Sequence, residues 1–322
     1  MTRARRWLLF ALKAIVSVSL IAYLLHDVNV SEAAARAKML SPGTGALVLL
    51  LLFTYVSVSA VRWYVVLRAL GSNPRLPDAA RITFIGAFFN QFLPATVGGD
   101  AVRIWESYRG GLGVVPAIHS VVLDRAGYLL GLSLLAVAGI STWDQNRLPT
   151  GATAAFWLVL AAALGLALAL VALDRLPVRL LSAAFRRGTA RFAADSRTVF
   201  TSPGNFGAVL LSALANQALL VIAVYVLARG LDVQVAFADC AALLPAIVLV
   251  SALPVSVAGW GVREYAMVTG FGYAGVPAAS ALLISLALAL FFMLASTPGG
   301  VLWLLRRKPL AVEAPVDEGV RR

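Results

Sequence analysis

Ionisable side chains inside long apolar stretches are the residues of this sequence best suited to chemistry. Asp100, Arg103 and Glu106 follow one another at helical i, i+3, i+6 spacing, and Asp124 and Arg125 lie about nine residues into an apolar run. Each such group costs at least ~2.5–3.5 kcal/mol near a bilayer centre, so it normally faces a protein interior or a wet cavity. Guanidiniums there suit bidentate capture of an anion. We therefore expect a polar site inside an apolar protein.

The composition places these charges in a membrane. The chain has 322 residues, of which 61% are hydrophobic and 13% charged, whereas soluble domains average ~45–50% and ~25%. This excludes a soluble enzyme and the disordered, fibrous and disulfide-stapled classes. The 27 Lys and Arg against 15 Asp and Glu indicate topology signals facing an anionic inner leaflet, and no nucleic-acid partner is expected.

Six segments are long enough to cross ~30 Å of hydrocarbon. They are residues 7–25, taken as an uncleaved anchor, 46–67, 116–140, 152–173, 206–228 and 276–305.

Two further apolar stretches, 82–99 and 240–260, are interrupted by proline and glycine. If each enters and leaves by the same face, the loop 174–204 with its six arginines is cytoplasmic, as the positive-inside rule requires. We predict an all-α polytopic membrane protein of the bacterial inner membrane, with six full spans, two re-entrant broken-helix hairpins and both termini cytoplasmic. Residues 1–308 would form one transmembrane domain, and 309–322 a flexible cytoplasmic tail.

The two broken segments also repeat in sequence. Residues 93–103 align without gaps with residues 253–263, and six of the eleven positions are identical. By the charge argument the two hairpins enter from opposite faces, so halves of about 46–140 and 206–305 would form an inverted repeat. Interrupted helices in both halves are typical of a midplane transport site. The alternative is a pair of kinked structural helices without a cavity.

The predicted substrate-binding set consists of polar, charged and helix-breaking residues around these breaks. It comprises Asn90, Gln91, Pro94, Gly98, Gly99, Asp100, Arg103, Asp124, Arg125, Pro254, Gly259, Arg263 and Glu264. The gapless alignment pairs Arg103 with Arg263, and both are expected to grip an anionic headgroup; the alternative is interfacial snorkelling.

Several other polar residues have competing interpretations. Asp100, for which the alignment gives no counterpart, is either a proton-coupling carboxylate or the counter-ion of Arg103. Asp124 and Arg125 either serve transport or form structural ion pairs between helices. Arg62 is expected to snorkel at the interface, and Asn216 and Gln217 to join helices.

No enzyme signature accompanies these residues. The sequence has no Gly-rich phosphate loop before a lysine, no nucleophile elbow and no metal-ligand spacing around its histidines. We expect a protein that is not an enzyme and uses no metal or cofactor.

One string of residues resembles a known family. Phe89-Asn90-Gln91-Phe92-Leu93-Pro94 leads into Gly98-Gly99-Asp100 and Arg103, with Arg62-Trp63 before and Asp124-Arg125 after. This resembles the lysylphosphatidylglycerol synthase transmembrane region, also called flippase-like, over roughly residues 10–305. That family's membrane region resembles a lipid flippase that moves aminoacylated phosphatidylglycerol, and other members accompany polyprenyl- or dolichol-linked sugar pathways. Only a short Pro-containing tail follows Arg306-Arg307-Lys308, so we expect this chain to lack the family's C-terminal aminoacyltransferase domain.

The resemblance implies a flippase-like protein translocating an anionic phospholipid or lipid-linked intermediate. The alternative is a membrane subunit or accessory of a polyprenyl-linked glycosyltransferase or aminoacyl-lipid pathway. The expected partners are membrane lipids and a separate lipid-modifying enzyme or glycosyltransferase, and the oligomeric state stays open.

Overall fold

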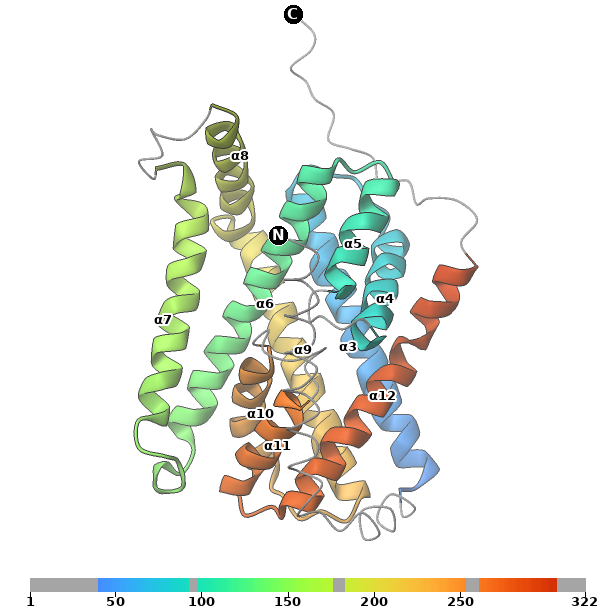
Figure 1. Ribbon diagram of the computed structural model, residues 1–322, viewed down its shortest axis with the longest axis vertical. Helices are drawn as coiled ribbons and strands as arrows, with labels where there is room; N and C mark the ends of the chain where they lie inside the picture. The colour runs from blue at the N-terminus through green and yellow to red at the C-terminus, as the bar shows by residue number, and fades with distance from the viewer. Residues whose placement is uncertain (1–39, 93–97, 176–182, 253–260, 306–322) are drawn as a thin grey trace, which may run out of the picture.

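The computed structural model describes residues 40–92, 98–175, 183–252 and 261–305 (Figure 1). Within these ranges every regular element is helical. The α-helices are α3 (Pro42–Ala69), α4 (Leu76–Phe92), α5 (Gly98–Arg109), α6 (Val114–Thr142), α7 (Ala152–Val171), α8 (Ala183–Phe200), α9 (Pro203–Gly230), α10 (Phe237–Ser251), α11 (Val262–Tyr273) and α12 (Ala278–Leu304).

Five of these helices, α3, α6, α7, α9 and α12, are long and apolar enough to cross a bilayer. They correspond to five of the six predicted spans; the first predicted span, 7–25, lies outside the described residues, as does the predicted tail 309–322. The all-α polytopic membrane fold is therefore confirmed. Helix α3 starts before its apolar run because the Ser41 hydroxyl accepts a hydrogen bond from Thr44 N and Pro42 occupies the first turn.

Each broken segment supplies one short helix, α4 or α10, which packs against the helix that follows it, α5 or α11. The helix pairs therefore extend beyond the predicted segments 82–99 and 240–260, to Arg109 and Tyr273. In the first pair, Gly99 lies beside Asn90 and Gly86 beside Arg103, so α5 runs back antiparallel to α4. Helices α10 and α11 form the second pair. In Figure 1 the α4–α5 pair lies in the upper half of the molecule and the α10–α11 pair in the lower half. The connecting residues 93–97 and 253–260 lie outside the described residues.

Helices α3–α6 and α9–α12 repeat in order and in length. The first unit has helices of 28, 17, 12 and 29 residues, and the second has helices of 28, 15, 12 and 27 residues. The same turn ends α5 and α11: Leu112 N donates to Ser107 O at 3.1 Å, and Val276 N donates to Phe271 O at 3.1 Å. Each turn contains a glycine with positive φ, Gly111 or Gly275, a conformation that a Cβ would disfavour.

These matching turns change the register expected from the gapless alignment. Asp100 and Glu264 are each the third residue of their helix, α5 and α11. The register counterpart of Arg103 is then Met267, and that of Arg263 is Gly99. The shift arises because the connection between α10 and α11 is longer than that between α4 and α5.

The two units are interleaved and run in opposite directions. Helices α3 and α9 pack antiparallel in the centre, with Gly230 near the end of α9 touching Thr44 near the start of α3. Helix α4 of the first unit packs on α12 of the second, and α10 packs on α6. Both crossings depend on a glycine: a Cβ on Gly299 would meet the backbone of Phe84, and one on Gly139 would meet Ala242. The backbones can approach closely only where these side chains are absent.

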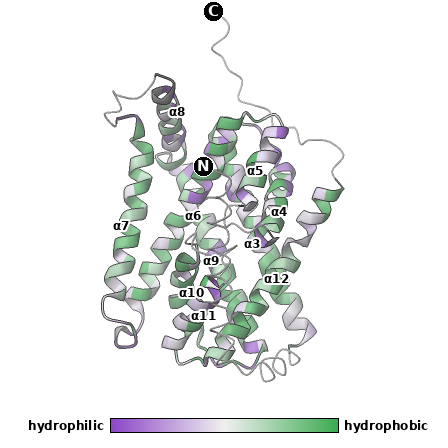
Figure 2. Cartoon of the chain, in the orientation of Figure 1, coloured by the Kyte–Doolittle hydropathy of each residue, from purple (hydrophilic) through white to green (hydrophobic). Residues whose placement is uncertain are grey.

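Helices α7 and α8 lie outside this repeat. Only Leu160 of α7 is buried, and Figure 2 shows the helix as almost entirely hydrophobic, as expected for a lipid-facing span. Helix α8 carries basic residues and lies at the end of the molecule where α3 ends and α9 begins (Figure 1). A hydrogen bond between His119 Nδ1 of α6 and Asp195 Oδ2 (2.5 Å) and an ion pair from Arg197 to Asp174 (3.0 Å) fix it. Hydrogen bonding from Arg197 lowers the pKa of the Asp174 carboxyl.

Candidate functional site

A polar cavity of about 220 Å³ lies between α3, the α4–α5 pair, α6 and α12. Three arginines and two aspartates line it, which leaves one net positive charge. The charged and amide side chains around it are Arg62, Asn90, Gln91, Asp100, Arg103, Asp124 and Arg125. Hydroxyl and aromatic groups also line the wall: Tyr55, Ser59, Thr83, Tyr128, Phe292 and Ser296.

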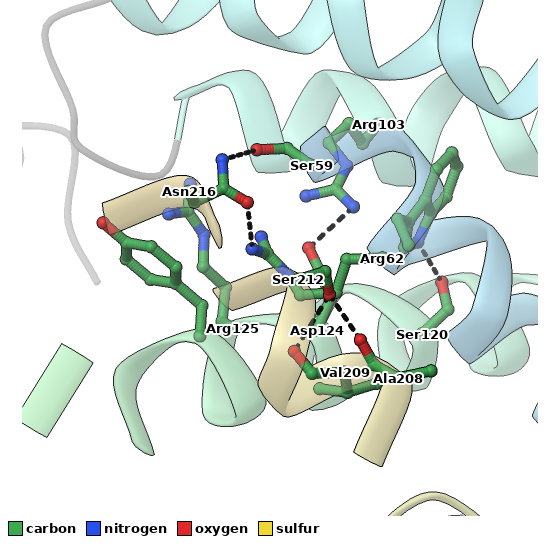
Figure 3. Close-up of polar contacts among 12 residues, drawn as sticks. Ser59, Arg62, Arg103, Ser120, Asp124, Arg125, Ala208, Val209, Ser212 and Asn216 are labelled. Carbon is green, nitrogen blue, oxygen red and sulfur yellow. Dashed lines mark hydrogen bonds and ion pairs between the residues drawn. The ribbon is translucent and has the colours of Figure 1, made fainter. Parts of the chain in front are cut away.

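Asp124 is the centre of the ion network. Its Oδ1 accepts a hydrogen bond of 2.8 Å from Arg62 Nε, and its Oδ2 accepts one of 2.9 Å from Arg103 Nη2. Figure 3 shows the two guanidiniums converging on this carboxylate from α3 and α5. All three side chains are buried. Because each oxygen has its own cationic partner, the carboxylate is stable away from water.

Asp100 occupies a second position in the same network. Its Oδ2 accepts a hydrogen bond of 2.6 Å from Arg125 Nε, and its Oδ1 accepts a longer one of 3.3 Å from Arg103 Nη1. The carboxylate lies in the first turn of α5, where the helix dipole favours a negative charge. Arg103 thereby bridges the two aspartates.

Two of the cavity arginines also contact aromatic rings, and one donates a hydrogen bond to an asparagine of α9. The Arg103 guanidinium carbon lies 4.6 Å from the ring centre of Trp63, and that of Arg62 lies 5.1 Å from the ring centre of Tyr128. Arg62 Nη1 also donates to Asn216 Oδ1 of α9 at 3.1 Å (Figure 3). Arg103 Nε is buried without a hydrogen-bond partner among the described residues. A buried unpaired donor on a cation is costly, and it favours an additional acceptor at this site.

The hairpin's local structure follows from its small and amide residues. Asn90 Oδ1 accepts a hydrogen bond of 2.8 Å from Gly99 N, so the end of α4 caps the start of α5. A Cβ on Gly99 would lie 2.1 Å from Gly86 O, so only glycine lets the two helices meet there. This packing directs Asp100 and Arg103 toward α6 and the cavity.

The second hairpin contains a different arrangement. Glu264 is fully buried; its Oε2 accepts a hydrogen bond of 2.6 Å from Gly261 N, and its Oε1 accepts from Arg263. Neither Arg263 nor Glu264 lines the charged cavity. The two predicted headgroup-binding arginines therefore lie in different environments and do not meet.

The structure brings together six of the predicted residues at the cavity: Asn90, Gln91, Asp100, Arg103, Asp124 and Arg125. Gly98 and Gly99 lie buried at the start of α5. Pro94, Pro254 and Gly259 lie outside the described residues.

The expectation that Arg62 snorkels is wrong, because its residue surface is only 6% exposed and it binds Asp124. A buried aspartate on another helix that needed a partner was the available signal. Asn216 joins helices as expected: its Nδ2 donates to Tyr55 O and Ser59 Oγ of α3. Gln217 does the same by donating to Tyr128 OH at 2.9 Å.

The arrangement of charges at this site is suited to the binding of an anion. Its guanidiniums are held in fixed positions, as recognition of a phosphate or carboxylate requires. Among the described residues, no group of three or more His, Cys, Asp or Glu side chains is placed to hold a metal ion.

Comparison with known proteins matches most of this chain to one protein family. The family described as "Lysylphosphatidylglycerol synthase TM region" matches residues 10–301, which include both hairpins and the whole charged cavity. A search of curated proteins finds no match for the chain. The matched region is the flippase-like membrane domain of that family and not its catalytic domain.

Proposed function

Because the chain belongs to the family of lysylphosphatidylglycerol synthase transmembrane regions, we propose that it translocates an anionic phospholipid or lipid-linked intermediate across the bacterial inner membrane. Membrane lipids are the partners in this proposal. A separate lipid-modifying enzyme or glycosyltransferase would supply or consume the transported lipid. Both termini and the basic loop 174–204 would face the cytoplasm.

The observation that carries the proposal is the net positive cavity beside a broken helix pair. A lipid headgroup crossing a bilayer must exchange water for other polar partners, because an unsolvated charge is costly in hydrocarbon. Arg103 and Arg125 of the cavity offer those partners to a phosphate, and the apolar helices around the cavity leave the acyl chains in the bilayer. Interrupted helices in two opposed repeats are the arrangement in which many transporters bind at mid-depth.

Leaflet-resolved transport tests the proposal. The full chain would be reconstituted into liposomes containing a fluorescent phosphatidylglycerol in both leaflets, and a membrane-impermeant reductant would then be added. Without transport, only the outer-leaflet label is lost. The proposal predicts loss beyond that fraction for phosphatidylglycerol or a polyprenyl phosphate analogue, and much less for phosphatidylcholine.

Two arginine variants make the assay specific to the site. Arg103→Gln should abolish the additional loss, since it removes the bridge between the two aspartates. Arg147→Gln is the matched control, because Arg147 is an exposed arginine paired with Asp144 between α6 and α7. Absence of transport for every analogue would contradict the proposal and favour an accessory role in a lipid-modification pathway.

A further inference from the structure

The three cavity arginines differ in how fully their donors are used. Arg62 and Arg103 are buried, and each donates to two different partners. Arg125 has a side chain that is 40% exposed and makes one hydrogen bond, from Nε to Asp100. Its two terminal nitrogens have no hydrogen-bond partner among the described residues. Arg125 is therefore the cavity arginine with a planar fork free for a ligand.

The two aspartates differ in how tightly arginines hold their carboxylate oxygens. Both oxygens of Asp124 are held at 2.8 and 2.9 Å by arginines that are themselves buried. Asp100 has one short contact, to the half-buried Arg125, and one long contact of 3.3 Å, to Arg103. Release of Asp124 would take the closest carboxylate from two buried cations, whereas release of Asp100 affects the half-buried Arg125 and Arg103, which keeps Asp124. Asp100 is therefore the anion that exchanges at lower cost.

The charge balance indicates the class of ligand. The side chains that line the cavity carry one net positive charge. The other charged residues of α4 and α5, which are Asp78, Arg81, Glu106 and Arg109, contribute two charges of each sign and leave this balance unchanged. A ligand with a single negative charge neutralises the cavity, whereas a dianionic phosphate monoester or a diphosphate overcompensates it.

We infer that Arg125 captures the phosphodiester of the transported lipid, and that this phosphodiester displaces Asp100 from Arg125. The inference rests on the proposed function and assigns its substrate class, a lipid whose headgroup carries one singly charged phosphodiester and no cationic group. Before the lipid binds, Asp100 accepts a hydrogen bond from Arg125 Nε and keeps the guanidinium oriented. When the lipid leaves, Asp100 returns to Arg125, which allows release.

Binding to the purified full chain in detergent tests this exchange. The probe is dihexanoyl phosphatidylglycerol, titrated calorimetrically, with dihexanoyl phosphatidylcholine and dihexanoyl phosphatidic acid as comparisons. Arg125→Gln should weaken phosphatidylglycerol binding by roughly 10- to 150-fold, as expected for loss of a charge-assisted contact. Arg125→Lys should bind with intermediate affinity, since lysine retains the charge and lacks the fork.

Asp100→Asn should have the opposite effect. Removal of the competing carboxylate should tighten phosphatidylglycerol binding about tenfold and slow turnover in the liposome assay, because release loses its internal replacement anion. Arg147→Gln should match the wild-type chain. Thermal unfolding without lipid identifies a variant that is misfolded, and the partly exposed position of Arg125 keeps its two variants informative if Asp100→Asn fails to fold.

Three outcomes would overturn the assignment. They are wild-type affinity in Arg125→Gln, weaker binding in folded Asp100→Asn, or phosphatidic acid or phosphatidylcholine binding as tightly as phosphatidylglycerol. These outcomes are distinct from failure of the proposed function. A chain that binds in the predicted order and transports no lipid would contradict translocation and leave Arg125 assigned to the phosphodiester.

Discussion

The two hairpins share a scaffold and differ in chemistry. Helices α5 and α11 have 12 residues each and end in the same glycine turn. The first hairpin adjoins a cavity with five charged side chains, whereas the second contributes Leu244, Ile247, Met267 and Phe271 to an apolar core. Where α5 carries Arg103, α11 carries Met267. Turns and close helix crossings maintain the backbone in both units. The first unit adds a network of paired charges around a cavity, whereas the second buries Glu264 beside Arg263 and away from that cavity.

Asp124→Asn should cause the most severe effect on the charged unit. The substitution removes the carboxylate that pairs with Arg62 and Arg103, so both buried cations lose their main partner. Breaking a buried pair costs ~3–5 kcal/mol in free energy of unfolding, and transport should be lost with it. Thermal unfolding of the purified variant measures the loss of stability. A variant as stable as the wild-type chain would show that Asp124 does not hold the charged unit together.

Gly299→Ala and Gly139→Ala should both destabilise the chain, because each glycine lies at a crossing that joins the two units. A Cβ would lie 1.9 Å from Phe84 O in the first case and 2.5 Å from Ala242 O in the second. Overpacking of this kind costs ~1–3 kcal/mol, so both melting temperatures should fall, and that of Gly299→Ala should fall further.

Gly165→Ala on α7 is the matched control for these two variants, because its Cβ would meet nothing within 4 Å. It should be neutral or slightly stabilising, since alanine favours helix more than glycine does. Destabilisation in only one of the two crossing variants would contradict the symmetric scaffold.

Glu264→Gln should separate stability from binding. Glutamine can still accept a hydrogen bond from Gly261 N, but it loses the charge that pairs with Arg263. Stability should fall by ~1–2 kcal/mol, while the affinity for dihexanoyl phosphatidylglycerol stays at the wild-type value. Asp100→Asn, its register counterpart, should instead change that affinity. A change in lipid affinity in Glu264→Gln would place a binding role in the second unit as well.

The weakest effect is expected from Asp174→Asn, outside both units. Arg197 lowers the pKa of Asp174, so the ion pair stabilises the folded chain at neutral pH. This contribution is lost only as the pH falls below about 4, the ordinary aspartate value. The wild-type chain should therefore lose more stability than Asp174→Asn between pH 5 and pH 3, as melting curves would show. The difference should be small, because both side chains of the pair are partly exposed. An equal loss of stability in both proteins would show that the ion pair does not stabilise the folded chain.

The sequence predicts the apolar spans and the two helix breaks because both depend on local composition. The span 46–67 and helix α3 differ by only a few residues, since capping at Ser41 extends the helix. The sequence could not supply the register of α5 and α11, because it depends on the lengths of the connections between the hairpin helices. The gapless match at Arg103 and Arg263 followed similar residues instead of equivalent helix positions.

The sequence indicates which residues form the charged network, but it does not indicate which of them pair. Asp100, Arg103, Asp124 and Arg125 stand out because each is ionisable within apolar sequence. Arg62 was misjudged because its partners come from α6 and α9, far away along the chain. Distant pairing of this kind depends on how the helices cross, which hydropathy does not encode.

Crosslinking of a lipid headgroup tests the central claim most directly. Phosphatidylglycerol with a photoreactive diazirine on its headgroup would be bound to the full chain, irradiated, and the modified residues mapped by mass spectrometry. We predict adducts on Ser59, Tyr128 and Ser296 of the cavity wall, reduced by Arg125→Gln and unchanged by Arg147→Gln. Adducts confined to the second hairpin or to lipid-facing α7, with none on the cavity wall, would contradict it.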